Sequence, residues 1–432
     1  EIILLPGQAA LLDDIESDVL AAIAGTGGGK ALDIETSIPT LKGWVDMKMI
    51  KVGDTVFDSD GKPTQVYYVS PIYLGRTCYK VCFDDGTFLI ADAAHLWRTQ
   101  TFSGRKNWFR QKYFVVDTKT IAETLIGQGG RLEYSIPISL PVEYEEKDLL
   151  VPPYTFGVWL GDGSSGDAII YSADPEVMES VCEEGVLVSP GVVRPNQGKA
   201  LSYRIGGGGH TRNSLGQYSA NSSIVSSLKN MGVYKNKCIP GEYLESSIEQ
   251  RTQLLMGLMD TDGYCAEDGG CEFTTINRLL VDGVRELISS LGIKNTLRQK
   301  IARIYGKDCG IVYLIHFTTD KPVFKLKRKH ERQRTKCRSV VNNRYIISVE
   351  QMPSRPVKCI AVSNAKGTYL AGRDYIPTHN TMLGYWWLHN RMEMYPGHTW
   401  LVAEPTYNLL SKVIIESSDP NRPSLFEYLD MV

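Results

Sequence analysis

Residues 24–30 read AGTGGGK, the start of a phosphate-binding loop that the chain does not complete. Such a loop requires Ser or Thr after its lysine, whereas Ala31 follows Lys30 here. A suitable residue, Thr381, comes directly after the tripeptide Thr-His-Asn at 378–380. Without residues 31–380 the chain reads AGTGGGKTMLGYWW, an unbroken loop that runs into a helix. The interruption indicates that a second protein of 350 residues lies inside the first.

The composition is that of an ordinary globular protein with room for several domains. Hydrophobic residues make up 43% and charged residues 22% of the 432 residues. At roughly 100–200 residues per domain, about three domains fit. No apolar run reaches the roughly 18 residues that a membrane helix needs, so we expect no membrane partner. The nine cysteines, an odd count without a secretion signal, favour reduced thiols in the cytoplasm.

Along the chain, the pattern of expected elements changes three times. Short strands and turns such as Asp84-Asp85-Gly86 fill residues 31–142, helices alternate with strands over residues 143–320, and strands return after residue 344. Two segments with the same apolar helix end and Asp-Gly stop, FGVWLGDG at 156–163 and MGLMDTDG at 256–263, form an internal repeat. These changes predict a multidomain chain in which an α/β unit interrupts an all-β unit. The expected parts are 1–30, 31–142, 143–338, 339–380 and 381–432.

Four segments of the insert resemble the conserved blocks of inteins, which excise themselves from a precursor. They are ALDIETSIPTLKG at 31–43, GTFLIADAAH at 86–95, and the segments 357–372 and 374–380. The resemblance implies an all-β intein (Hint) splicing domain in which residues 31–142 and 339–380 interleave and bring both splice junctions together. It also implies that residues 31–380 are removed and that Lys30 is joined to Thr381.

The first residue of the insert differs from that of ordinary inteins. These begin with Cys or Ser, which attacks the preceding carbonyl, but the methyl group of Ala31 cannot attack. Cys359 stands where ordinary inteins usually carry Asp, and with Trp97 and Thr378 it matches the triplet of class 3 inteins. The resemblance therefore implies Cys359 as the first nucleophile. The alternative is an engineered Cys→Ala change at residue 31, which leaves a splicing-inactive precursor that only binds or cuts DNA.

Splicing of this kind needs no cofactor, because the residue types supply the chemistry. A thiol is the strongest side-chain nucleophile near neutral pH, so Cys359 would attack the Lys30 carbonyl and form a branched thioester. His95 would polarise that amide and protonate the departing nitrogen. The acyl group would pass to the hydroxyl of Thr381.

The resemblance assigns the last steps to neighbouring residues. Asn380 would cyclise onto its own carbonyl with help from His379 and so release the insert. Trp97 and Thr378 are expected to pack against Cys359 and tune its environment. Asp92, where the family usually has Thr, is a further candidate helper.

The two repeated segments resemble LAGLIDADG motifs, the hallmark of homing endonucleases. The resemblance implies an α/β LAGLIDADG domain at 143–338, whose carboxylates Asp162 and Asp262 meet at the base of two paired helices and bind Mg²⁺. Lys237 matches the family's lysine block and would assist the attacking water or the leaving group. The expected substrate is double-stranded DNA, the host gene that lacks the insert.

The stretch from Lys321 to Arg338 carries nine Lys and Arg residues against a single acid, Glu331. Two interpretations remain open at this point. The stretch is either a solvated linker or an arm that contacts DNA phosphates.

The flanking residues predict an α/β P-loop ATPase that is restored by splicing. Gly25, Gly29 and Lys30 would then bind the phosphates of ATP, and Thr381 would bind Mg²⁺. Before splicing Lys30 and Thr381 are apart, which argues against a third interpretation, an active ATPase with a large inserted regulatory domain.

The loop together with TWLVAEPTYNLL at 399–410 resembles phage terminase large subunits. That resemblance implies a phage- or prophage-encoded protein in a bacterial cytoplasm, and a terminase assembly as the partner after splicing.

Overall fold

The structure is a computed structural model that describes residues 30–106, 113–127, 129–191, 200–206, 224–304, 307–334, 339–364 and 366–379. Gly25, Gly29, Asn380 and Thr381 lie outside these described residues. The chain divides into two compact units. The outer unit ends at Ser139 and resumes at Asn343, and the inner unit is Leu140–Asn342.

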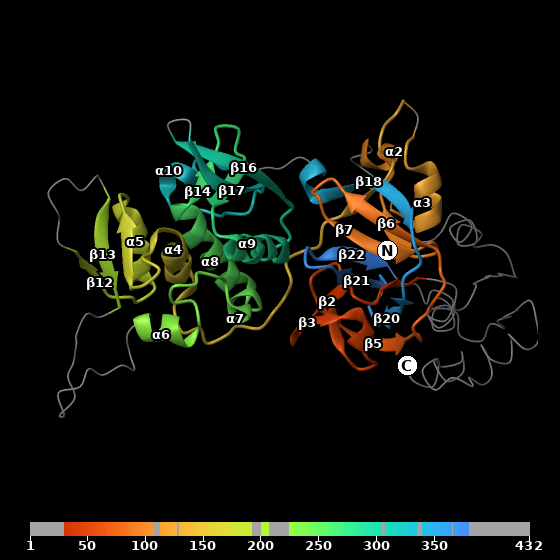
Figure 1. Ribbon diagram of the computed structural model, residues 1–432, viewed down its shortest axis with the longest axis horizontal. Helices are drawn as coiled ribbons and strands as arrows, with labels where there is room; N and C mark the ends of the chain where they lie inside the picture. The colour runs from red at the N-terminus through yellow and green to blue at the C-terminus, as the bar shows by residue number, and fades with distance from the viewer. Residues whose placement is uncertain are drawn as a thin grey trace, which may run out of the picture. The chain divides into compact units, whose positions relative to one another are not determined.

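The outer unit is built almost entirely of short antiparallel strands in three sheets (Figure 1). The first sheet has the order β10 (Ser135–Pro137), β18 (Asn343–Met352), β6 (Cys78–Phe83), β7 (Phe88–Asp92), β1 (Leu32–Asp33), β19 (Val357–Lys358). The second has the order β20 (Ile360–Val362), β5 (Pro63–Val69), β4 (Thr55–Phe57), β2 (Ser37–Thr40), β3 (Gly43–Asp46). The third has the order β21 (Thr368–Ala371), β22 (Ile376–His379), β8 (Leu96–Thr99), β9 (Phe114–Asp117). Short helices are η1 (Met47–Met49), α2 (Phe102–Lys106) and α3 (Thr118–Thr124).

Strands from the two ends of the insert pair with one another in every sheet of this unit. The cross pairs are β1 with β19, β18 with β6, β20 with β5 and β22 with β8. Figure 1 shows one of these pairs, β18 in blue beside β6 in orange. This interleaving agrees with the expected all-β splicing fold, and it places segments some 300 residues apart in one core.

The expected turn at residues 84–86 joins β6 and β7. Gly86 takes a φ of +83°, a left-handed value that glycine adopts without steric cost. The preceding Asp85 forms a buried ion pair with Arg344 at 2.6 Å, and Arg344 also donates to the carbonyl of Asp374. Removal of either partner from a buried ion pair is strongly destabilising. These contacts of Arg344 therefore hold the turn and the segment before β22 together.

The inner unit contains helices and two antiparallel sheets. The helices are α4 (Pro153–Asp162), α5 (Pro175–Glu183), α6 (Ile224–Asn230), α7 (Gly241–Leu244), α8 (Ile248–Thr261), α9 (Arg278–Ser290) and α10 (Lys327–His330), with η2 (Ser339–Asn342) at its end. One sheet has the order β11 (Ile169–Ser172), β13 (Leu201–Ile205), β12 (Val188–Pro190). The other has the order β14 (Gly263–Cys265), β15 (Cys271–Thr275), β17 (Lys307–Phe317), β16 (Asn295–Ile304).

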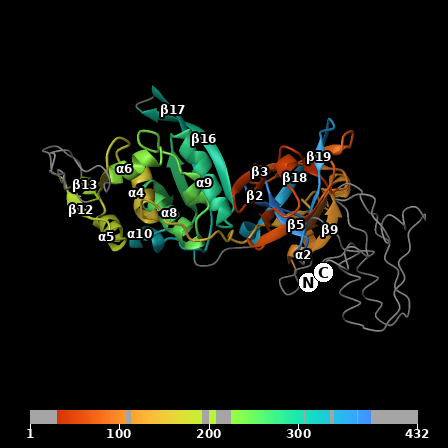
Figure 2. The same ribbon diagram turned by 90° about the horizontal axis from the view of Figure 1, so that it is seen from below.

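Helices α4 and α8 lie side by side at the centre of this unit, as both views show (Figures 1 and 2). Proline occupies the first turn of α4, and a capping box between Ser247 and Gln250 starts α8. A Cβ on Gly157 would lie 2.3 Å from the carbonyl oxygen of Leu254, and a Cβ on Gly257 would lie 2.2 Å from that of Tyr154. The two glycines therefore allow the helix backbones to touch.

We expect Gly257→Ala to destabilise the inner unit by about 2 kcal/mol. Alanine favours a helix over glycine by roughly 1 kcal/mol. The new methyl group would clash with backbone that cannot rotate away, and overpacking of this kind costs roughly 1–3 kcal/mol, occasionally more. Denaturant unfolding measures the difference. Gly241→Ala in α7, where a Cβ meets nothing closer than 3.8 Å, is the matched control. Equal stability of the two variants would contradict the close helix contact.

No helix among the described residues is long and apolar enough to cross a membrane.

Candidate functional sites

The carbonyl of Lys30 is held by the ring of His95 in the outer unit. The Nδ1 atom of His95 lies 2.8 Å from the carbonyl oxygen of Lys30. His95 is fully buried, and this burial lowers its pKa to about 4, so the ring is neutral at neutral pH. Because a carbonyl oxygen only accepts, Nδ1 must carry the hydrogen of the neutral ring. The hydrogen-bond donor that is expected to polarise the Lys30–Ala31 amide is therefore in place.

Ala31 and Cys359 lie at the end of the same strand pair. Strand β1 pairs with β19 through Leu32–Lys358 and Asp33–Val357, so Ala31 and Cys359 each lie one residue beyond the last paired residues. Both residues also belong to one small apolar cluster. The strand pairing therefore brings the only cysteine of the closing block next to the amino-terminal junction.

The backbone of Cys359 is fixed from the opposite side by Ser70. The Cys359 N–H donates to the Ser70 hydroxyl and the Ser70 N–H donates to the Cys359 carbonyl, both at 2.9 Å. The neighbouring Lys358 is anchored through Nζ to the carbonyls of Lys48 and Ile50. Cys359 is half-buried, and burial raises its thiol pKa to about 12, while the Lys30 ammonium acts in the opposite direction. The thiol is therefore protonated at neutral pH and needs a base.

Trp97 and Thr378 contact residues around the junction. The Trp97 ring lies edge-on to the His95 ring at 4.9 Å, and its N–H donates to Thr118 at 2.9 Å. Thr378 donates its hydroxyl to the carbonyl of Tyr369 at 3.1 Å. These contacts place the Trp97 side chain against His95 and the Thr378 side chain against β21. Their packing against Cys359 stays a prediction.

His379 lies near the same histidine. His379, the last described residue of this segment, pairs with Leu96 at the end of β22. Its pKa is lowered to about 3, first by burial and then by the charges of Lys30, His95 and Arg98. His379 and His95 therefore lie close together, and the expected convergence of the two junctions stays a prediction because Asn380 and Thr381 lie outside the described residues.

In the inner unit, Asp162 is the last residue of α4 and Asp262 caps the end of α8, so both lie at the helix ends. Burial, and then the charge of Asp262, raise the pKa of Asp162 to about 6. Burial also raises the pKa of Asp262. A cation would favour the charged forms of both carboxylates, and oxygen ligands are those that Mg²⁺ prefers. The donor set thus fits Mg²⁺, with the remaining ligands left to water and phosphate.

Lys237 binds the end of α4. Its Nζ donates to the carbonyls of Leu160, Gly161 and Gly163 at 3.0, 3.0 and 2.7 Å. Helix carbonyls that lack a partner carry partial negative charge, which an ammonium stabilises. Burial lowers the pKa of Lys237 to about 8, against the opposing charges of Asp262 and Asp162. The predicted lysine therefore lies at the carboxylate pair.

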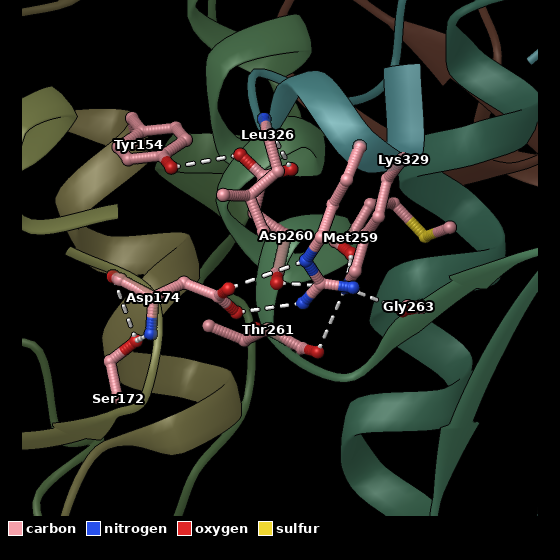
Figure 3. Close-up of polar contacts among 10 residues, drawn as sticks. Tyr154, Ser172, Asp174, Met259, Asp260, Thr261, Gly263, Leu326 and Lys329 are labelled. Atoms are coloured by element: carbon pink, nitrogen blue, oxygen red, sulfur yellow. Dashed lines mark hydrogen bonds and ion pairs between the residues drawn. The ribbon is translucent and has the colours of Figure 1, made fainter. Parts of the chain in front are cut away.

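A second lysine, which sequence reasoning missed, has the same place on α8. Lys329 donates to the carbonyls of Met259, Asp260, Thr261 and Gly263 (Figure 3). Burial lowers its pKa to about 8 as well. Lys329 lies in the basic stretch, so neither the solvated-linker nor the phosphate-arm interpretation describes it. The sequence spacing could have indicated Lys329, because it follows Asp262 by 67 residues and Lys237 follows Asp162 by a similar 75.

Asp260 holds the segment that carries Lys329. Its carboxylate accepts hydrogen bonds from the Tyr154 hydroxyl at 2.8 Å and from the Leu326 N–H at 3.1 Å (Figure 3). It also accepts one from the Lys325 N–H at 3.1 Å. The first repeat has Leu160 at the place of Asp260. The two halves of the site are therefore supported by different contacts.

Metal binding at the carboxylate pair is expected to weaken in acid. Protons compete with the metal for Asp162, so Mn²⁺ affinity should fall about tenfold per pH unit below pH 6. Acid has the opposite effect on the folding stability that Asp162 contributes. A carboxyl with a raised folded-state pKa favours folding most below about pH 4, and this contribution is lost as the pH rises through about 6. Calorimetric Mn²⁺ titrations at pH 5, 6 and 7 test the first statement, with Asp162→Asn expected to flatten the dependence. Equal affinity at pH 5 and 7 would contradict it.

Residues 249–346 match the family model of a LAGLIDADG-like domain. A replicative DNA helicase DnaB of Mycobacterium intracellulare is 36% identical over 385 residues, which cover 85% of this chain and 61% of the helicase. A replicative DNA helicase DnaB of Mycobacterium leprae is 42% identical over 81 residues, 19% of this chain and 13% of the helicase. The chain spans less than two thirds of the length of these relatives.

The solved structures that match this chain include an intein splicing domain and a homing endonuclease. The Msm DnaB1 intein splicing domain bound with zinc is 15% identical, has a TM-score of 0.27, and is matched over 81% of this chain and 100% of its own. The homing endonuclease I-DmoI in complex with DNA and Mn is 15% identical, has a TM-score of 0.26, and is matched over 39% of this chain and 89% of its own.

The family model supports a LAGLIDADG-like domain within the insert. The comparisons do not support a terminase host, P-loop flanks or a phage origin, because the relatives found are DnaB helicases.

Proposed function

We propose that residues 31–380 excise themselves and join Lys30 to Thr381 by the class 3 route, with Cys359 as the first nucleophile. One arrangement carries the proposal. The carbonyl of Lys30 is bound by His95 while the next residue, Ala31, packs in one apolar cluster with Cys359. A nucleophile and a polarised carbonyl held in near-contact geometry are what the first acyl transfer requires.

In the first step, Cys359 Sγ attacks the carbonyl carbon of Lys30 and forms a thioester. The His95 N–H stabilises the negative charge that develops on the carbonyl oxygen. Trp97 keeps the His95 ring in this orientation through its edge contact. Ala31 carries no nucleophile, so the internal Cys359 supplies it.

In the later steps, the acyl group passes to the Thr381 hydroxyl and Asn380 cyclises. His379 is buried and neutral, so it can accept a proton during that cyclisation. Thr378 holds β22 against β21 next to it. An O-to-N shift then gives the Lys30–Thr381 peptide bond. Splicing in this scheme uses no cofactor.

His95→Ala is expected to slow thioester formation by about 100-fold, because it removes the donor to the Lys30 carbonyl. His95→Asn, whose amide N–H can reach the same oxygen, should recover part of the rate. The readout is release of the amino-terminal fragment by dithiothreitol, followed by intact mass. Equal rates for all three chains would exclude His95 from this step.

An intact-mass time course of the purified chain tests the proposed function. Splicing yields an excised product of 350 residues and a ligated product that joins residues 1–30 to 381–432. A chain that stays intact would favour the alternative, a splicing-inactive precursor whose Ala31 replaces an ordinary nucleophile.

We further propose that the inner unit cuts double-stranded DNA, the host gene without the insert. Asp162 and Asp262 would hold Mg²⁺, which supplies an activated water and shields the leaving phosphate oxygen. Lys237 and Lys329 lie at these carboxylates with lowered pKa values, so each can exchange a proton with that water. The raised and lowered pKa values at one pair of helix ends support this site.

For the ligated flanks we propose a P-loop ATPase that uses ATP and Mg²⁺ through Gly25, Gly29, Lys30 and Thr381. The curated relatives favour a replicative helicase as the host, whereas residues 399–410 resemble a terminase. Strand unwinding and DNA packaging by the host protein, assayed after splicing, separate these two.

A further inference from the structure

Ala31 lies between an acid and a thiol in the first sheet. Leu32 of β1 pairs with Ala91 of β7 on one side and with Lys358 of β19 on the other. One residue further along, Ala31 lies beside Asp92 of β7, and Ala31 and Cys359 pack in one apolar cluster. The Asp92 N–H donates to the carbonyl of Ala31 at 3.0 Å, which extends the pairing on the β7 side. Directly paired residues project to the same face of a sheet, so the side chains of Ala31 and Asp92 share one face.

The Asp92 carboxylate has one oxygen engaged and one without a partner. Oδ2 forms an ion pair with Arg76 at 3.0 Å. Oδ1 is buried and has no hydrogen-bond partner among the described residues. Asp92 itself is 2% exposed. Such an oxygen is costly to bury unless it takes part in the chemistry of the site.

Arg76 fixes this carboxylate relative to the strand that carries Cys359. Its guanidinium lies 3.8 Å above the ring of Tyr73, and the Tyr73 backbone exchanges hydrogen bonds with Val357. Val357 precedes Cys359 by two residues on β19. The acid and the thiol are therefore held by one connected set of contacts.

The first splicing step needs both a base and an acid at this place. The thiol of Cys359 must lose a proton, and the Ala31 nitrogen must gain one when the peptide bond breaks. The Nδ1–H of His95 is engaged by the Lys30 oxygen, and its Nε2 is buried without a hydrogen-bond partner among the described residues. That His95 protonates the departing nitrogen stays a prediction.

We propose that Asp92 carries the proton from Cys359 to the nitrogen of Ala31. This inference rests on the proposed splicing function. As the carbon–sulfur bond forms at the Lys30 carbonyl, the Sγ proton passes through a water to Oδ1 of Asp92. As the carbon–nitrogen bond breaks, the proton moves from Oδ1 to the Ala31 amine. Asp92 returns to its carboxylate form, and no further reactant is consumed.

The titration behaviour of the three groups agrees with this path. Burial raises the pKa of Asp92, which makes its carboxylate a better base, and the Ala31 N–H acts on the same carboxylate. The charge of Asp92 raises the pKa of the Cys359 thiol, which keeps the thiol protonated until it attacks, and the charge of Arg76 lowers it.

The test follows thioester formation alone, in an Asn380→Ala background that blocks the last step. Asp92→Asn is expected to slow dithiothreitol-induced release of residues 1–30 by about 100-fold, because an amide cannot carry the proton. Asp92→Glu should recover part of the rate. Asp58→Asn is the matched control, since Asp58 is also a buried carboxyl of this unit with a raised pKa. It should release the fragment at the unsubstituted rate.

Two readouts separate chemistry from misfolding. With Asn380 restored, Asp92→Asn should still cyclise Asn380, which requires a folded outer unit. The release rate of the unsubstituted chain should fall in acid as Asp92 becomes protonated, and this fall should be absent in Asp92→Asn. Equal release by Asp92→Asn and the unsubstituted chain would overturn this inference alone. No thioester in the unsubstituted chain would overturn the proposed function and this inference with it.

Discussion

Replacement of Cys359 by alanine is expected to abolish excision, with a rate loss on the order of 10³-fold or more. The nucleophile of the first step would be gone, and Ala31 offers no substitute. Of the unit's other cysteines, Cys78 packs in the same apolar cluster as Ala31 and Cys359, whereas Cys82 lies further along β6. Intact mass over a time course measures the loss.

Cys82→Ala is the matched control for this experiment. It removes a partly buried cysteine from the same unit and should leave excision unchanged. Excision by the Cys359→Ala chain would contradict the internal-cysteine route. An unsubstituted chain that also stays intact would instead point to a blocked amino-terminal step.

Joint replacement of Asp162 and Asp262 by asparagine is expected to reduce DNA cleavage on the order of 10³-fold or more, because the metal loses both of its carboxylate ligands. Each single replacement should lose at least one strand cut and leave nicked DNA. The measurement is cleavage of a plasmid that carries the uninterrupted host sequence, in Mg²⁺. DNA binding and splicing should both persist, since the splicing residues lie in the other unit.

Asp282→Asn, at an exposed ion pair on α9, is the control for the carboxylate experiment. Cleavage that survives in the double variant would exclude these carboxylates as the metal site. An unsubstituted chain that binds the plasmid without cutting it would show a nuclease that has lost its activity while the insert still splices.

Much of the site was predictable because its residues belong to local patterns. Asp162 and Asp262 close two similar apolar helix ends, so their positions follow from the repeat. Asn380 and Thr381 were identified by the second half of the broken loop. Lys329 was missed because nothing next to it in the chain marks it. Its function depends on carbonyls at the end of a helix almost 70 residues earlier.

The partners of the splicing residues were the least predictable part. The sequence did not indicate that the ring of Trp97 contacts the ring of His95. In the sequence Asp92 was only a candidate helper, and the pairing of β7 with β1 places it beside the start of the insert. Hydrophobic periodicity indicates which face of a strand is buried, but it does not indicate which strand lies alongside.

The sequence by itself determined where the insert begins and ends, and which residue types are available for the chemistry. These features are short-range patterns that can be recognised in the sequence without a structure. They are a loop motif, a terminal His-Asn-Thr and two Asp-Gly helix ends. Only the tertiary structure decided that Ala31 meets Cys359, 328 residues later, with Asp92 on its other side. The reason is physical. Strand order and register are set by packing of the whole core, and a shift of one residue would turn these side chains to the opposite face.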